Sequence, residues 1–328
     1  MYCVGVKVLK VLRVIKVFKV FAGRGDVLFG SCGVKFRYFY RFQPRKESII
    51  LHRNTAHDMQ RIDIEDILYR RTGRHLPRPV AALLRRLIHE RELNEILAGG
   101  GSLPPKEFID HVLRHIGIEY SVVRTADIPS GGRYIFAANH PFGGPDGMIV
   151  ARTLMDGFKD VGVIVNDMLS NIEPLRPLWI PVNKYGRQSA ATQFAYDEAL
   201  ASPTKQIFTF PAGFCSRIVG GRVADTEWKV RFVRDARRYD RRIVPVYVDG
   251  RLSKHFYAIY LLRKVLHIGI NIELALLADE MFRQRGKHIR IIFGAPVDIS
   301  RDGHSDREIA DDIRNSVYSL PKILKRTK

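Results

Sequence analysis

The sequence has little of what marks several common protein classes. It contains three cysteines in 328 residues, Cys3, Cys32 and Cys215, which are too few and too scattered for a disulfide framework or a zinc site. Nowhere do about 18 uncharged apolar residues follow one another, so we expect no membrane-spanning helix. The Gly-x-Ser-x-Gly elbow of serine hydrolases is absent. These absences favour a reduced, cytoplasmic setting, with any membrane contact peripheral.

Acidic residues are also in short supply. The chain has 34 Asp and Glu residues against 54 Lys and Arg residues, which gives a net charge of +20. A protein this basic is attracted to polyanions, which include nucleic acid, anionic lipid and acidic substrates, and charge alone does not choose among them. The hydrophobic content of 46% is ordinary. The length suits one large α/β domain with a smaller helical part.

The first 58 residues differ from the rest of the chain. In the run VGVKVLKVLRVIKVFKVF a base stands at every third position, which gives neither a helix nor a strand a clean face. Three interpretations stay open: a segment lying on an anionic membrane, a poorly ordered tail, or a start codon assigned too early, with Met59 as the true start. A signal peptide is disfavoured because lysines interrupt its apolar core. We predict that residues 1–58 form a basic extension.

Regular element patterns begin at residue 59. Apolar spacing predicts a short helix over 62–68, a longer one that Pro77 and Pro79 open and that Gly99 to Gly101 end, and a third over 105–115. We assign 59–116 to an N-terminal helical region containing a helical hairpin. Strands are predicted at 134–138, 161–165, 179–182, 207–210, 243–248 and 289–293. Helices are predicted at 147–157, 189–201, 228–238, 256–266 and 305–318. This alternation predicts an α/β domain over 117–328, with a mostly parallel or mixed sheet flanked by helices.

The segment AANHPFGGPDGM carries the strongest chemical signal. An apolar strand ends at Asn139 and His140, a tight Pro- and Gly-rich loop follows, and Asp146 stands where a helix N-cap is expected. Ligands of open α/β sheets bind at the carboxyl ends of strands, so His140 is well placed for catalysis.

The residue types of this segment fit acyl transfer. An imidazole can take the proton of an attacking hydroxyl, and a nearby carboxylate can orient the ring and stabilise the imidazolium. We therefore predict His140 as the general base and Asp146 as its partner. Backbone N–H groups of Gly143 and Gly144 are expected to stabilise the oxyanion. The acceptor's own hydroxyl attacks, so the reaction needs no protein nucleophile. The competing interpretation is a capped turn with an incidental histidine.

Asn139, His140 and Asp146 resemble the first motif of the lysophospholipid (glycerol-phosphate) acyltransferase superfamily, which is Asn-His, four residues, then Asp. Here five residues separate His140 from Asp146. That spacing and the HPFGGPDG wording are similar to a bacterial branch described as putative hemolysins or O-acyltransferases for amino-acid lipids.

Three later segments resemble the remaining motifs in family order. WIPVNKYGRQSA resembles the second motif and implies Lys184 and Arg187 as cations for the acceptor's anionic group. FPAGFCSR resembles the third, with Phe210, Pro211 and Gly213 matching, Ala212 replacing the usual Glu, and Arg217 expected to supply the lost cation. IVPVYVDG resembles the fourth and implies that Pro245 borders the acyl channel. Cys215 is expected to be a small buried filler.

The resemblance implies an acyltransferase that moves a fatty acyl group from acyl carrier protein or coenzyme A to the hydroxyl of a lysolipid acceptor. The missing Glu makes an acceptor other than glycerol phosphate plausible, so a lyso amino-acid lipid stands beside lysophosphatidic acid. We expect no metal and no cofactor beyond the thioester co-substrate. An anionic membrane is the expected partner rather than nucleic acid, with the protein peripheral on the inner face of the cytoplasmic membrane.

Two alternatives stay open on sequence grounds. The same dyad can activate water, which would make the protein a thioesterase or hydrolase. A non-catalytic basic protein that binds membranes or nucleic acid is the other. Glu107, His111 and His115 share a helix face by their spacing, but they lack the zincin pattern, and we interpret them as an ordinary helix surface.

Overall fold

The computed structural model describes residues 61–166, 172–182, 189–267, 273, 276–300 and 303–326, without the side chains of 70–72 and 324–326. The predicted extension 1–58 and the expected acceptor-binding Lys184 and Arg187 lie outside these residues. The chain divides into two compact units, Met1–Leu84 and Arg85–Lys328. Within the described part, none of the helices combines the length and apolarity needed to cross a membrane.

The N-terminal helices differ from the sequence prediction in one respect. Helix α2 (Ile64–Thr72) is capped by Asp63, whose carboxylate accepts the amides of two first-turn residues. The long helix expected to run to Gly99 is instead two helices, α3 (Arg78–Leu87) and α4 (Glu90–Gly100). His89 between them has a φ of 54°, and its ring bonds Asp279 at 3.0 Å and stacks on Phe282. That long-range contact lies at the break between the two helices, and the hairpin arrangement stays a prediction.

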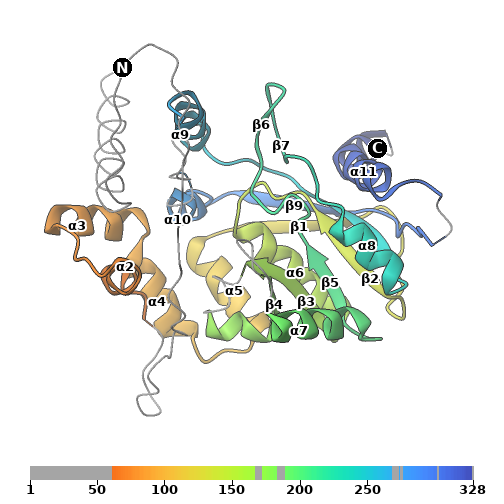
Figure 1. The fold of residues 1–328 in the computed structure, drawn as a ribbon, viewed down its shortest axis with the longest axis horizontal. Coiled ribbons are helices and arrows are strands. Elements are labelled where there is room, and N and C mark those ends of the chain that lie inside the picture. The colour runs from red at the N-terminus through yellow and green to blue at the C-terminus, as the bar shows by residue number, and fades with distance from the viewer. Residues whose placement is uncertain are drawn as a thin grey trace. The chain divides into compact units, whose positions relative to one another are not determined.

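A seven-stranded sheet forms the centre of the second unit (Figure 1), in the order β1-β9-β8-β2-β5-β3-β4. Strands β8, β2, β5, β3 and β4 run parallel, while β9 lies antiparallel to β8 and carries β1 parallel beside it. The mixed sheet that the sequence predicted is thus confirmed. Its strands are β1 (Glu119–Arg124), β2 (Tyr134–Ala138), β3 (Val161–Asn166), β4 (Trp179–Val182), β5 (Gln206–Thr209), β8 (Arg242–Val248) and β9 (His288–Phe293).

Helices cover both faces of this sheet (Figure 1). All five residues of β2 are buried, and because neighbouring residues of a strand point to opposite faces, both faces must be covered. On one face Ile135 shares an apolar core with Phe232 and Ile313 from two helices. On the other, Phe136 meets Phe158 and Phe293 edge-on. The helices are α5 (Pro105–Ile116), α6 (Pro145–Gly157), α7 (Ala190–Ala201), α8 (Arg231–Arg238) and α11 (Asp306–Arg326).

Several short helices and strands of the structure were not predicted from the sequence. A 3₁₀ helix η2 (Glu173–Leu178) precedes β4, and a hairpin of β6 (Arg217–Val219) and β7 (Arg222–Ala224) projects above the sheet in Figure 1. Helix α9 (Lys254–Val265) corresponds to the predicted 256–266, whereas α10 (Leu277–Phe282) was missed. Helices α4 and α5 belong to the second unit, together with the sheet.

Candidate active site

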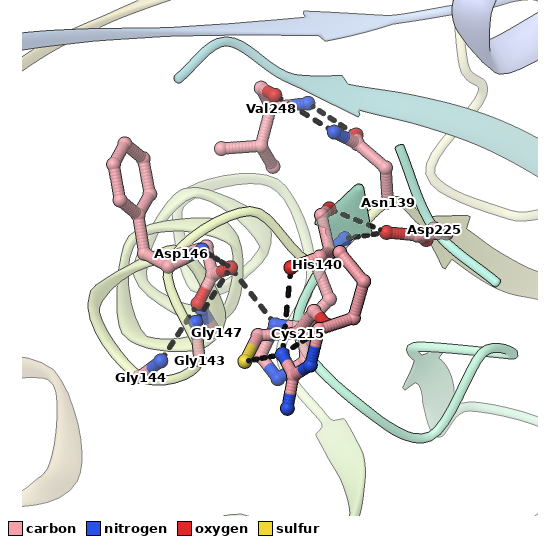
Figure 2. Close-up of polar contacts among 12 residues, drawn as sticks. Asn139, His140, Gly143, Gly144, Asp146, Gly147, Cys215, Asp225 and Val248 are labelled. Carbon is pink, nitrogen blue, oxygen red and sulfur yellow. Dashed lines mark hydrogen bonds and ion pairs between the residues drawn. The ribbon is translucent and has the colours of Figure 1, made fainter. Parts of the chain in front are cut away.

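His140 and Asp146 meet at the carboxyl end of β2. The strand ends at Ala138, and α6 begins only seven residues later, so the chain must turn sharply between them. The turn places His140 Nδ1 2.8 Å from Asp146 Oδ2 (Figure 2). The imidazole keeps 16% of its side-chain surface exposed, whereas the carboxylate has none. The five-residue spacing therefore still closes the pair that the sequence predicted.

The Asp146 carboxylate sits in a nest of backbone amides. Oδ2 accepts the N–H groups of Phe142 at 2.9 Å and Gly143 at 3.3 Å, and Oδ1 accepts those of Gly144 and Gly147, each at 3.0 Å. Burial opposes ionisation, but the charge and hydrogen bond of His140, together with the amides of Phe142 and Gly147, hold the pKa of Asp146 below its usual value. The site therefore contains a fixed anion beneath a partly exposed ring.

Asp146 differs from the sequence prediction in its place on the helix. The N-cap is Gly144 and Pro145 is the first helical residue, so Asp146 lies inside the first turn of α6 rather than at the cap. Proline suits that first position because its missing N–H would have no helical partner there. From the first turn the carboxylate bends back onto the loop, where the amide ends of the helix favour a negative charge.

The oxyanion role expected of Gly143 and Gly144 is wrong in this structure. Both amides already donate to Asp146, so they hold the dyad's carboxylate instead of facing a substrate. Gly143 is still required for the loop, because its φ is 78° and a Cβ there would lie 3.0 Å from Leu277 Cδ2 and 3.3 Å from Cys215 Cβ.

The hydrogen bond between ring and carboxylate sets the chemistry of the imidazole. If Nδ1–H donates to the ionised Asp146, the lone pair of Nε2 is left free to accept a proton. An aspartate that holds the other ring nitrogen also stabilises the imidazolium that forms when the proton is taken. The arrangement can therefore act as a general base toward a hydroxyl or a water.

Phe210 lies directly against the imidazole ring of His140. It follows β5, and its ring stacks on the imidazole of His140 with centroids 3.7 Å apart and an interplanar angle of 21°. A Cβ on Gly147 would lie 3.4 Å from its edge. Pro211 and Gly213 form the following turn, in which the Gly213 N–H donates to Phe210 O and Pro211 O accepts from Lys229 N. The third motif thus positions the histidine.

Arg217 does not fit the expected acceptor-binding role. It is 5% exposed, and its Nη1 donates to the carbonyl oxygen and the Sγ of Cys215, both at 2.7 Å. Its Nη2 lies 3.6 Å from the buried carboxylate of Glu273. The guanidinium carbon stands over the rings of Phe256 and Tyr260, at 5.0 and 5.3 Å. Sequence spacing could not show that this cation is committed inside the protein.

The structure also locates three other motif positions in the core. Ala212, which replaces the family Glu, is 2% exposed. Cys215 is buried and free, as expected of a filler, and burial raises the pKa of its thiol. Pro245 lies in β8, and its place beside an acyl channel stays a prediction. It pairs with Ala137 inside the sheet, and a Cβ on Gly294 would meet both its ring at 2.7 Å and Leu320 at 3.2 Å.

Asp225 is a functional candidate that the sequence did not reveal. Its Oδ1 accepts the His140 N–H at 3.2 Å (Figure 2). The same oxygen accepts the Ser216 hydroxyl at 2.6 Å, and Oδ2 accepts from Trp228 Nε1 at 3.0 Å. Burial raises the pKa of Asp225 against the effect of these hydrogen bonds. Its N–H donates to the Tyr318 hydroxyl of α11 at 2.7 Å. The Asp225 carboxylate thus fixes the backbone of His140.

Asn139, the residue before His140, joins β2 to β8. Its Nδ2 donates to Val248 O at 2.9 Å, and Val248 N donates to its Oδ1 at 2.7 Å (Figure 2). The carboxamide therefore extends the β2–β8 ladder by side-chain bonds at the point where the backbone leaves for the active-site loop. Both partners are buried, so neither group can turn to water.

Replacing Asn139 by Ala should lower both stability and activity. It leaves the N–H and C=O of Val248 unpaired in the core, at a cost of about 2–5 kcal/mol in the free energy of unfolding. Urea unfolding of Asn139→Ala measures this cost, with Asn315→Ala on the exposed surface of α11 as the matched control. Equal unfolding midpoints for the two variants would contradict the role given to Asn139.

Known proteins are similar in sequence to most of this chain. A family model described as acyltransferase matches residues 69–326. The lyso-glycine lipid O-acyltransferase of Phocaeicola vulgatus is 35% identical over 240 residues, which cover 72% of this chain and 86% of that protein. The lyso-glycine lipid O-acyltransferase of Bacteroides thetaiotaomicron is 34% identical over 265 residues, covering 79% and 97%.

A solved structure is also similar. The 1-acyl-sn-glycerophosphate (LPA) acyltransferase PlsC of Thermotoga maritima aligns with 79% of this chain and 88% of its own, at 15% identity and a TM-score of 0.40. The family match and the two sequence relatives carry the assignment. The chain therefore belongs to the lysophospholipid acyltransferase superfamily and is an O-acyltransferase.

Proposed function

We propose that this protein transfers a fatty acyl group from a thioester to the hydroxyl of a lyso-glycine lipid, with His140 as general base and Asp146 as its orienting carboxylate. The observation that carries the mechanism is the 2.8 Å contact between His140 Nδ1 and the buried Asp146. The proposal for the acceptor rests on the two relatives, whose names specify that lipid.

The proposed reaction balances without a covalent enzyme intermediate. The acceptor hydroxyl attacks the thioester carbonyl while its proton passes to His140 Nε2. The tetrahedral intermediate then collapses, the C–S bond breaks, and the thiolate leaves as the imidazolium returns the proton. Asp146 stays ionised throughout. The products are the esterified lipid and the free thiol of the carrier.

Neighbouring nucleophiles are poor substitutes for the acceptor's hydroxyl. The Ser216 hydroxyl donates a hydrogen bond to Asp225 inside the protein. Cys215 is buried, and its raised thiol pKa keeps it protonated and weakly nucleophilic. Both contacts support direct transfer to an incoming hydroxyl.

The core position of Ala212 supports an acceptor other than a glycerol phosphate. A glycine lipid would present a carboxylate, which lysine and arginine side chains recognise. Lys184 and Arg187 remain our proposed cations from the second motif. Lys229 joins them, because its Nζ lies 3.6 Å from where a Cβ of Gly213 would stand, over the turn that follows Phe210.

The donor and the location follow from charge and chemistry. We propose acyl carrier protein or coenzyme A as the thioester carrier. The net charge of +20 would attract an acidic carrier and an anionic bilayer alike. A peripheral position on the inner face of the cytoplasmic membrane would give the enzyme both its carrier and its lipid acceptor.

The acceptor is tested by competition. Purified protein receives equal amounts of lyso-glycine lipid and lysophosphatidic acid, with acyl carrier protein or coenzyme A thioester as donor, and the esterified lipids are measured by mass spectrometry. We expect acylated glycine lipid to dominate by about tenfold or more. Preferential acylation of lysophosphatidic acid would overturn the proposed acceptor, and release of free fatty acid without any acylated lipid would overturn the transfer itself.

A further inference from the structure

Helix α9 is apolar on two opposite sides. One side faces the core through Phe256, Tyr257 and Tyr260, none of them more than 6% exposed. Away from this buried side, toward the C-terminal end of the helix, Leu261, Val265 and Leu266 have 43%, 72% and 48% of their surfaces exposed. A single exposed Leu on a soluble protein is ordinary, but three large hydrophobic side chains within six residues form a patch.

Helical spacing arranges Leu261 and Val265 of this patch in a stripe, and Leu266 is the C-cap residue that follows them. Lys254, Ala258, Leu261 and Val265 are separated by four, three and four residues, so they share one side of the helix, turned away from the buried aromatic residues. All four are exposed. We call Leu261, Val265 and Leu266, with Lys254 and Lys264 at their borders, the α9 face.

Bases predominate in the sequence around the α9 face, although one of them, Arg263, pairs with the buried carboxylate of Glu273 at 2.9 Å. Between Asp249 and Glu273 the sequence contains no acidic residue, while it contains four bases: Arg251, Lys254, Arg263 and Lys264. Lys264 Nζ stands 5.2 Å from the Tyr260 ring centroid, at the edge of the exposed side. Apolar side chains bordered by bases, with no acid among them, complement an anionic lipid surface.

A short series of side-chain contacts connects the α9 face to the His140 loop. The ring of Phe142 fills the place where a Cβ on Gly250 would stand, just before α9 begins. From the buried side of α9, Phe256 and Tyr260 pack under Arg217, which donates to Cys215. Cys215 in turn lies beside the catalytic loop, since a Cβ on Gly143 would stand 3.3 Å from Cys215 Cβ. Whatever meets the α9 face is thus held near the His140 loop.

We propose that the α9 face docks on an anionic bilayer and thereby presents the active site to its lipid acceptor. Leu261, Val265 and Leu266 enter the interface, and Lys254 and Lys264 contact lipid headgroups. Docking itself needs no acyl transfer; only its purpose, delivery of the acceptor, rests on the proposed function.

The test uses the full chain and vesicles of phosphatidylcholine with or without phosphatidylglycerol. The variant Leu261→Ser/Val265→Ser/Leu266→Ser is compared with Phe194→Ser, which removes a side chain 71% exposed on α7. In sedimentation assays we expect the triple variant to lose binding to anionic vesicles by roughly tenfold or more, while Phe194→Ser binds as the unaltered protein does. Lys264→Glu should weaken binding to anionic vesicles alone.

Further measurements separate this inference from the enzymatic one. With a short-chain, water-soluble lysolipid and no vesicles, the triple variant should keep the turnover of the unaltered protein. If the protein binds vesicles through the α9 face but forms no acylated lipid, docking stands and the proposed function falls. Undiminished vesicle binding by the triple variant would overturn docking. So would equal binding of the unaltered protein to neutral and anionic vesicles, or a triple variant that changes its oligomeric state instead of its vesicle binding.

Discussion

Replacing His140 by Ala should lower kcat by about 10³–10⁴-fold while the protein stays folded. The Nε2 lone pair of the His140 ring points away from Asp146 and takes the proton of the acceptor hydroxyl in the proposed mechanism. Loss of the ring therefore leaves that hydroxyl without a base. The His140 side chain is 16% exposed and fills little of the core. Its removal therefore affects chemistry far more than packing.

The control for this variant is His288→Ala, which alters an exposed histidine at the start of β9. Circular dichroism and urea unfolding should show both variants folded, and acyl transfer should fall in His140→Ala alone. Transfer by folded His140→Ala at the rate of the unaltered protein would show that another group is the base.

Replacing Asp146 by Asn should reduce kcat by roughly 10³–10⁴-fold and also destabilise the active-site loop. The two carboxylate oxygens accept five hydrogen bonds, one from the His140 ring and four from backbone amides. An amide side chain turns one oxygen into a donor. Whichever oxygen is replaced, at least two donors then face a donor, and the histidine loses the partner that fixes its tautomer.

The matched control is Asp156→Asn at the far end of the same helix, where the carboxylate pairs with Lys106 and Arg152. That site is half exposed, so its loss should cost little stability or activity. Kinetics and urea unfolding of the two variants test the assignment. Equal effects in both would indicate that Asp146 serves the helix rather than the dyad.

The same carboxylate gives a pH dependence of stability. Its pKa is lower in the folded protein than in the unfolded chain, where it is about 3.9. Its stabilising contribution is therefore complete above that value and is lost as the pH falls through the lower folded-state pKa. The difference in unfolding free energy between the unaltered protein and Asp146→Asn should accordingly shrink below about pH 4.

Much of the sheet could be predicted because its strands are buried on both faces. Residues 134–138 and 179–182 were predicted to the residue, since each is an apolar run ended by polar or Pro- and Gly-rich sequence. Strand β1 was missed because its residues are half exposed and show no clean alternation. Strands β6 and β7 have three residues each, too few for any period. His89 broke a helix through contacts with α10, which lies about 190 residues later.

The active site, like the sheet, has features that the sequence predicts and others that it does not. The pairing of His140 with Asp146 was predictable because only a short loop separates the end of the strand, where His140 lies, from the first turn of the helix, which holds Asp146. The use of the Gly143 and Gly144 amides was not, since sequence does not show which acceptor a backbone N–H will find. Asp225 reaches His140 across 85 residues and left no local signal. Arg217 was misassigned because its burial depends on α9 and on Glu273.

The most direct test of His140-dependent transfer follows thioester cleavage and ester formation in one reaction, with and without lyso-glycine lipid. We predict that thioester is consumed only when the acceptor is present, one molecule for each ester formed, and that both signals vanish in His140→Ala. Consumption without the acceptor, or ester formation that persists without the imidazole, would contradict the account.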